Sequence, residues 1–166
     1  MQTKAQVPGL TDAEMARLMD AYGDMLTGLC SLMLGEYHMA QDITQETFFR
    51  AWKAGGFHGK NEKAWLIRVA INLCHDHHRS RWFRYVERHK PIEEMDIPMQ
   101  EQDREIAIMV QALPYQEKEA VVLFYYNGLS ADTIAQILHT TRSTVYRRLQ
   151  RAEKRLKLEL ERGEHS

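Results

Sequence analysis

The chain has little of what builds disulfide-rich, membrane-spanning or β-sheet proteins. It has two cysteines among 166 residues, and Cys30 and Cys74 lack the paired spacing of a disulfide framework. No apolar run approaches the length of a membrane span, and the N-terminus lacks an apolar segment of signal-peptide length. We therefore expect a protein of a reducing compartment, cytoplasmic and without direct membrane insertion.

Strand signals are also scarce, because β-branched residues are scattered and most of the chain follows a 3.6-residue period. The sequence predicts an all-α fold. Residues 91–103 (PIEEMDIPMQEQD) are acidic, hold two prolines and lack sustained helical periodicity, which is typical of a linker. We predict two small helical domains, at 8–88 and 104–162, joined by a flexible acidic linker at 89–103.

The formal net charge of −1 conceals a strong segregation of charge along the chain. Residues 68–90 hold six Lys or Arg and two acids, whereas residues 91–119 hold eight acids and two bases. The C-terminal part is basic again. A near-neutral total therefore does not exclude a nucleic-acid partner.

Residues 113–158 read as a helix-turn-helix. Ser130 can cap a short amphipathic helix that runs to about Leu138, and residues 139–141 (HTT) interrupt it. A second helix is predicted from about Arg142 to beyond Lys157. This arrangement is a common device for reading duplex DNA.

The second of these helices has one apolar stripe and a basic remainder. The stripe recurs at spacings of four, three and four residues and comprises Val145, Leu149, Ala152 and Leu156. Arg147, Arg151 and Lys154 must then face outward. Residues 142–157 hold seven bases and one acid, an excess that favours an anionic partner over ordinary pairing along a solvated helix. The first turn is the part that reaches base edges, through Arg142, Ser143, Thr144, Tyr146 and Arg147.

The N-terminal half predicts a capped helix from Thr11, a break at Gly35 and a second helix. The inward residues expected in the first helix are Met15, Leu18, Met19, Tyr22, Leu26 and Leu29. The second helix carries a polar stripe of Asp42, Gln45, Glu46 and Arg50, and four large apolar residues, Ile43, Phe48, Phe49 and Trp52. These four cannot all face one narrow core, which indicates either packing between helices or a docking surface.

A third helix follows a short polar loop and changes character along its length. Its first half is apolar and supplies the expected core residues Trp65, Leu66, Val69, Ala70 and Leu73. Its second half mixes cations, polar groups and rings: Asn72, His75, Asp76, Arg79, Arg81, Trp82, Arg84 and Tyr85. Such a mixture suits unstacked nucleic-acid bases, although a basic helix end covering the domain edge has the same composition.

Two segments together resemble one protein family. AQDITQETFFRAWKAGGFHGKNEKAWLIRVAINLCHDHHRSRW resembles the conserved second region of bacterial RNA polymerase sigma factors of the extracytoplasmic-function type, and ALPYQEKEAVVLFYYNGLSADTIAQILHTTRSTVYRRLQRAEKRLK resembles their fourth region. The resemblance implies an alternative sigma factor, not an enzyme and without a cofactor. His139 and Ser143 stand where the family often has glycine, and both residues suit a turn or a helix start.

The resemblance also implies partners and residue roles. The expected partners are promoter DNA, core RNA polymerase through its largest-subunit clamp helices and the flap of its second-largest subunit, and an anti-sigma factor. Polymerase docking falls on Asp42, Gln45, Glu46, Phe49, Arg50 and Trp52. Recognition and melting of the minus-ten element fall on Phe57, His58, Lys60, Asn61, Asn72, His75, Asp76 and Arg79. Duplex recognition of the minus-thirty-five element falls on Arg142, Ser143, Thr144, Tyr146, Arg147, Arg148 and Arg151.

Two other hypotheses remain open from the sequence. Cys74, His75, His77 and His78 could hold a metal ion if the fold brought Cys30, His38 or His58 near. A stand-alone helix-turn-helix regulator with a ligand-sensing N-terminal half would instead bind a palindrome as a symmetric dimer.

Overall fold

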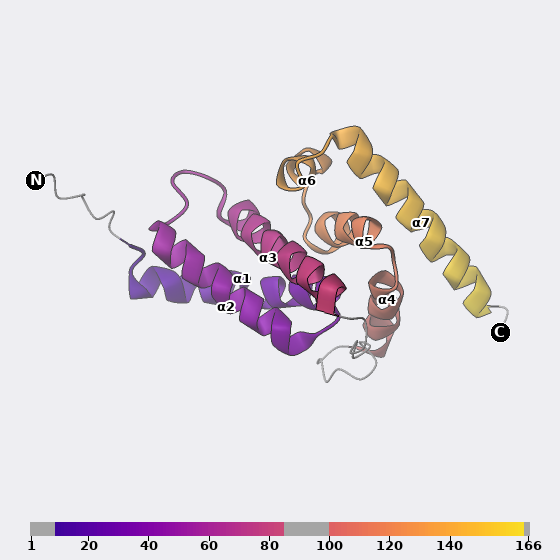
Figure 1. Ribbon diagram of the computed structural model, residues 1–166, viewed down its shortest axis with the longest axis horizontal. Coiled ribbons are helices and arrows are strands. Elements are labelled where there is room, and N and C mark those ends of the chain that lie inside the picture. Colours follow the sequence, from indigo (N-terminus) through magenta and orange to yellow (C-terminus); the bar gives the residue numbers. More distant parts are fainter. Residues whose placement is uncertain (1–8, 85–99, 165–166) are drawn as a thin grey trace, which may run out of the picture.

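The computed structural model describes residues 9–84 and 100–164, and all regular structure in these two ranges is helical. This confirms the all-α fold. In chain order the elements in Figure 1 are α1 (Asp12–Leu34), α2 (Tyr37–Ala54), α3 (Glu62–Arg84), α4 (Glu101–Gln111), α5 (Tyr115–Val121), the π-helical segment η2 (Val122–Tyr126), α6 (Ala131–Ile137) and α7 (Arg142–Glu164). Of these described helices, none is both long enough and apolar enough to cross a bilayer.

The first three helices form a bundle because each turns an apolar face inward. Helix α1 begins after Thr11, whose hydroxyl accepts a hydrogen bond from the Glu14 amide while the Glu14 carboxylate accepts one from the Thr11 amide. It ends at Gly35, where a φ of +67° suits glycine. The residues buried between the helices include Leu18, Leu26, Leu29, Phe48, Leu66, Ile67 and Ile71.

The expected inward face of α1 is confirmed except at Met19. Leu18, Leu26 and Leu29 are buried and Tyr22 is half-buried, whereas Met19 is 49% exposed. Met19 follows Leu18 by one residue, which turns it roughly 100° around the helix axis. Its inclusion in the core was therefore wrong.

The helix-turn-helix has the predicted boundaries. The Ser130 hydroxyl accepts a hydrogen bond from the Thr133 amide at 3.2 Å and caps α6, which ends at Ile137. His139 then adopts a left-handed φ of +54°, and α7 begins at Arg142. The predicted stripe of α7 is confirmed: Val145, Leu149 and Ala152 are buried, and Leu156 packs against the same core.

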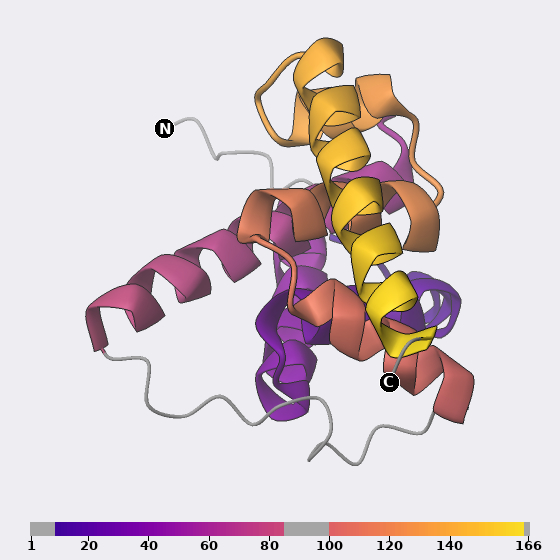
Figure 2. The same ribbon diagram turned by 90° about the vertical axis from the view of Figure 1, so that its right-hand side faces the viewer.

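The two halves of the chain pack against each other. One continuous apolar core includes Leu29 and Met33 of α1 together with Val122 and Leu123 of η2. Helix α1 contacts α4, α5 and η2, and α3 contacts α6, so α4–α7 lie along one side of the α1–α3 bundle (Figures 1 and 2). The end of α3 projects away from the other helices (Figure 2).

The predicted linker is only partly within the described residues. Helix α4 begins at Glu101, three residues before the predicted boundary at 104. Residues 85–99, which hold most of the predicted linker, lie outside the described ranges. The domain limits therefore stay a prediction.

Lys118 in α5 is a charged residue inside this packed assembly. Its side chain is buried, and its ammonium lies 5.5 Å from the centre of the Tyr115 ring. Burial lowers the pKa of Lys118 from 10.5 to about 8, while the charges of Cys74 and Glu119 oppose that change. Between pH 8 and 10.5 the unfolded chain binds more protons here than the folded chain, so stability should rise with pH in this window.

Replacing Lys118 with Met should raise the free energy of unfolding at pH 7 by about 1–3 kcal/mol, because Met keeps an apolar stem and removes a buried charge. The advantage over the parent should shrink between pH 8 and pH 10, as the parent lysine loses its proton. Urea denaturation of both proteins across this range measures the difference. Lys157→Met, at an exposed position of α7, is the control and should change little. An advantage that does not vary with pH would contradict burial as the cause.

Candidate nucleic-acid interface

The start of α7 is held by hydroxyl groups and presents an exposed polar surface. The Thr141 hydroxyl accepts a hydrogen bond from the Thr144 amide at 3.1 Å, and the two hydroxyls lie 2.9 Å apart. Arg147 donates to the Thr144 hydroxyl at 3.0 Å. Around this cap the predicted base-reading residues Arg142, Ser143, Tyr146 and Arg147 are exposed, and Thr144 is half-buried.

The cations farther along α7 divide into paired and unpaired groups. Arg155 is bonded to the buried carboxylate of Glu117 at 2.8 Å. Arg147, Arg151 and Lys154 are exposed, and among the described residues none of them has a carboxylate partner. The outward face of α7 is therefore an uncompensated row of positive charge, as DNA phosphates require.

Arg148 does not share this outward face. It is half-buried and lines a small cleft with His75, Arg79 and Glu119. One residue beyond Arg147 corresponds to roughly 100° around the helix, which turns Arg148 toward α3. In this arrangement Arg148 is separated from the other predicted minus-thirty-five residues.

The predicted minus-ten residues of the loop before α3 have different surroundings. Phe57 is 9% exposed and packs edge-to-face on Trp65 with ring centres 5.2 Å apart, so its ring supports the loop and is not offered to a base. His58 has a φ of +51°, and its Nε2 lies 2.9 Å from the Ala54 carbonyl oxygen. Asn61 caps α3 by accepting from the Ala64 amide at 2.9 Å.

The other four predicted minus-ten residues lie on one face of α3, at spacings of three and four residues. Asn72 is exposed, and Asp76 and Arg79 pair at 2.9 Å on the surface. The His75 ring instead bonds the buried carboxylate of Glu119 in α5. Three of the four are therefore accessible, and the fourth is engaged by the other half of the chain.

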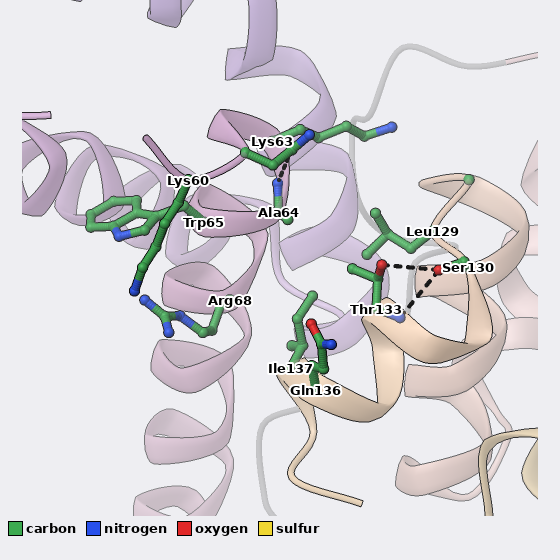
Figure 3. A pocket seen from close by; sticks show the side chains of 12 residues that line it. Lys60, Lys63, Ala64, Trp65, Arg68, Leu129, Ser130, Thr133, Gln136 and Ile137 are labelled. Atoms are coloured by element: carbon green, nitrogen blue, oxygen red, sulfur yellow. Dashed lines mark hydrogen bonds between the residues drawn. The ribbon is translucent and has the colours of Figure 1, made fainter. Parts of the chain in front are cut away.

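A cleft of about 670 Å³ lies between the start of α3 and α6. Lys60, Trp65 and Arg68 line it from the α3 side, and Gln136 and Ile137 line it from α6 (Figure 3). Among the described residues neither Lys60 nor Arg68 has a carboxylate partner. Lys60 was predicted to bind DNA.

Lys63 and Arg68 also line this cleft, and the sequence did not predict either of them. Trp65 was predicted to lie in the core, but it is only half-buried. The Lys63 ammonium donates to the Asn127 carbonyl oxygen at 2.6 Å. Helical spacing could have found Arg68, because three residues separate it from Trp65 and place both on one side of α3.

The predicted polymerase-docking residues form an exposed surface on α2. Asp42, Gln45, Glu46 and Arg50 are exposed, as are Phe49 (51%) and Trp52 (48%), whose rings lie 5.9 Å apart. Ile43 and Phe48 point into the bundle. The four apolar residues thus divide into two core residues and two that leave an apolar patch on the surface, as a docking surface requires.

The Cys/His cluster is occupied by other contacts. Hydrogen bonding with Cys30 and burial raise the pKa of Cys74 well above its ordinary value, which disfavours the thiolate that metal binding needs. The His75 ring bonds Glu119, and His78 stacks on Tyr115 with centres 4.1 Å apart. Within the described ranges no three ligand-type side chains lie close enough to hold an ion.

Thr141→Ala should lower the free energy of unfolding by about 1 kcal/mol, because it removes the cap of α7. Thr141→Ser keeps the hydroxyl and should lie within a few tenths of a kcal/mol of the parent. Urea denaturation followed by circular dichroism measures both. Equal losses in the two variants would show that the methyl group, and not the cap, is responsible.

Two family models match the chain in order: sigma-70 region 2 over residues 18–84 and sigma-70 region 4 over residues 103–156. The chain is 29% identical over 164 residues to the ECF RNA polymerase sigma factor SigW of Bacillus subtilis, a match that covers 87% of this chain and 88% of that protein. It is 30% identical over 172 residues to the ECF RNA polymerase sigma factor SigL of Mycobacterium tuberculosis, covering 95% and 96%.

Solved structures show the same fold. The sigma factor RpoE in complex with the anti-sigma factor NepR from Bartonella quintana has a TM-score of 0.72 at 21% identity, covering 88% of this chain and 96% of that chain. CnrH in complex with the cytosolic domain of CnrY has a TM-score of 0.69 at 21% identity, covering 91% and 90%. Both matches extend across the two halves of the chain.

Proposed function

The chain belongs to the extracytoplasmic-function (ECF) sigma factors of the sigma-70 family, and from this membership we propose how its surfaces divide the work of starting transcription. It is an alternative sigma factor, a transcription initiation factor and not an enzyme, that binds core RNA polymerase and promoter DNA. One observation carries the proposal: Arg147, Arg151 and Lys154 of α7, which have no carboxylate partner among the residues that the structure describes, face outward from the half that matches region 4.

Helix α7 reads the minus-thirty-five element as a duplex. Its first turn enters the major groove, where Arg142, Ser143, Thr144, Tyr146 and Arg147 reach base edges. Arg151 and Lys154 follow on the same exposed side and meet phosphates. Arg148 joins this set only when α7 moves away from α3.

The minus-ten element is taken as a single strand by α3 and the loop before it. Lys60 and Arg68 attract the backbone, while the half-buried Trp65 ring and the face of Asn72, His75, Asp76 and Arg79 meet unstacked bases. His58 and Asn61 set the shape of the loop, with Phe57 beneath it. Stacking contributes about 1–3 kcal/mol per base, comparable with the roughly 1–2 kcal/mol lost per opened step. Capture of one or two bases therefore offsets much of the cost of melting.

Helix α2 docks on the clamp helices of the polymerase. Phe49 and Trp52 supply apolar area at the centre, and Asp42, Gln45, Glu46 and Arg50 surround them with polar groups. Region 4 would bind the flap of the second-largest subunit, which sets the distance between the two DNA-reading surfaces.

An anti-sigma factor would control the free protein. Support comes from the solved sigma factor structures of the same fold, one of which contains an anti-sigma factor. We place this control, and the protein, in the cytoplasm, where polymerase and promoters are found. A partner that binds the free chain should lower transcription in proportion to its amount.

Run-off transcription on a pool of genomic promoter fragments tests the proposal, with purified core polymerase in the presence and absence of this chain. Initiation at a discrete subset of sites only in its presence is the expected result. A folded chain that gives no stimulation, yet binds a palindromic site as a dimer without core, would instead support the stand-alone regulator.

Replacing both Arg151 and Lys154 with Ala should weaken binding of the holoenzyme to promoters found by run-off mapping. Two lost phosphate contacts should also reduce the slope of log affinity against log salt by about two. Arg162→Ala, at the far end of α7 and paired with Glu159, is the matched control and should leave the slope near the parental value. Titration at four salt concentrations separates these outcomes, and an unchanged slope would remove both cations from the interface.

Replacing Asp42 and Glu46 with Lys should weaken binding to core polymerase by at least tenfold, because two acids on the docking surface become like charges toward cationic partner groups. Asp20→Lys with Asp24→Lys makes the same charge change on exposed positions of α1 and is the control. Fluorescence anisotropy of labelled chain with core measures both. Equal affinities for the two double variants would contradict the assignment of α2.

A further inference from the structure

The cleft between the start of α3 and α6 carries positive charge that no acid of its lining balances. Three cations line it, Lys60, Lys63 and Arg68, and none of the other lining residues is an Asp or Glu. Arg68 is half-buried and has no carboxylate partner in the described part of the chain. Lys63 donates to the Asn127 carbonyl oxygen, which leaves its charge in place. A partly buried cation is unfavourable unless an anion lies close, so the cleft suits an anionic ligand.

Two acids that are close to the cleft in sequence are engaged elsewhere. Glu62 at the start of α3 pairs with Arg17 of α1 at 2.7 Å. Asp132 of α6 lies 3.9 Å from Arg142 of α7. The charge of the three cleft cations therefore stays available to a ligand.

The rest of the lining is apolar or able to form hydrogen bonds. The half-buried Trp65 ring lines the α3 side, and Leu129 and Ile137 line the side of α6 and the turn before it (Figure 3). The exposed Gln136 amide can both donate and accept. The volume of about 670 Å³ is within the range of roughly 300–1,000 Å³ that is typical of small-molecule sites. Cations suit phosphates and an aromatic ring suits a planar base, which together describe a nucleotide.

We propose that this cleft binds a nucleoside di- or triphosphate in the free protein, with the phosphates at the three cations and the base beside Trp65. One phosphate group carries only about −1.5 to −2 at pH 7, so three cations favour more than one phosphate. The wall formed by α6 is not part of the minus-ten surface of α3, which makes the nucleotide site separate. The two sites share Lys60, Trp65 and Arg68, so a bound nucleotide and a minus-ten strand should compete.

Titration of the free full-length protein with N-methylanthraniloyl-ATP, in buffer with EDTA in place of magnesium, tests this site. Tryptophan excitation with energy transfer to the label reports binding. Saturable binding to one site is expected, with displacement by unlabelled ATP and competition at least about tenfold weaker from adenosine and from tripolyphosphate. No saturable binding up to about 1 mM would overturn the nucleotide site. Displacement by tripolyphosphate as effective as that by ATP would also overturn it, because the base would then contribute nothing.

Two tryptophan variants locate the bound label. Trp65→Phe should remove most of the energy transfer, because Trp65 lines the cleft. Trp52→Phe, on the exposed docking surface of α2, is the matched control and should keep most of it. Equal losses in the two variants would place the label away from the cleft.

Gln136→Glu adds one negative charge to the cleft with almost no change of shape. It should weaken binding of the labelled nucleotide by about fivefold or more, because like charges then face each other. Gln102→Glu, at an exposed position of α4, makes the same change outside the cleft and should leave the affinity within about twofold of the parent. Unchanged affinity in Gln136→Glu would remove α6 from the site and contradict a nucleotide held between the two walls.

Single-stranded DNA is the other source of a phosphorylated base, and the holoenzyme distinguishes it. Gln136→Glu should keep the parental affinity of the holoenzyme for a minus-ten oligonucleotide and the parental level of run-off transcription. An equal loss of affinity for nucleotide and oligonucleotide would make the cleft part of the DNA site and overturn a separate one. Normal run-off transcription by a parent chain that binds no labelled nucleotide would refute the nucleotide site alone. A parent chain that binds the nucleotide but never stimulates core would refute the proposed function alone.

Discussion

The rotation of α7 about its own axis is the constraint on which the rest of the account depends. Burial of Val145, Leu149 and Ala152 against α5 and α6 fixes that rotation. Arg147 and Arg151 then face outward, with no carboxylate partner in the described part of the chain, and Arg148 faces α3. The caps at Ser130 and Thr141 fix where the helix begins. If α7 packed with a different rotation, its cations would no longer share one outward side. The apolar stripe is therefore as important to DNA reading as the arginines.

Both apolar and polar contacts join the two halves of the chain. An apolar core runs through both halves, yet the contacts nearest the DNA-reading residues are charged or aromatic: Glu119 with His75, and Tyr115 with His78. A sigma factor has to connect three partners, which are polymerase, a duplex and a single strand.

Local features were predictable from the sequence and non-local ones were not. The Ser130 cap, the left-handed turn at His139 and the stripe of α7 follow from interactions within a few residues, and the structure confirms them. Whether Phe57 is buried or Arg148 faces α3 depends on which helices are neighbours. The partnership of His75 and Glu119 spans 44 positions and carries no periodic signal. The roles of the exposed residues came from family resemblance, because exposure alone does not distinguish a docking surface from a solvated one.

The most direct test of the central claim is a structure of this chain bound to core polymerase on an open promoter. The account predicts the first turn of α7 in the major groove of the minus-thirty-five duplex, with Arg147 and Arg151 toward DNA. It also predicts an unstacked minus-ten base against the face of α3 that carries Asn72, Asp76 and Arg79. A promoter complex in which α7 faces away from DNA, or in which the minus-ten strand lies away from α3, would contradict it.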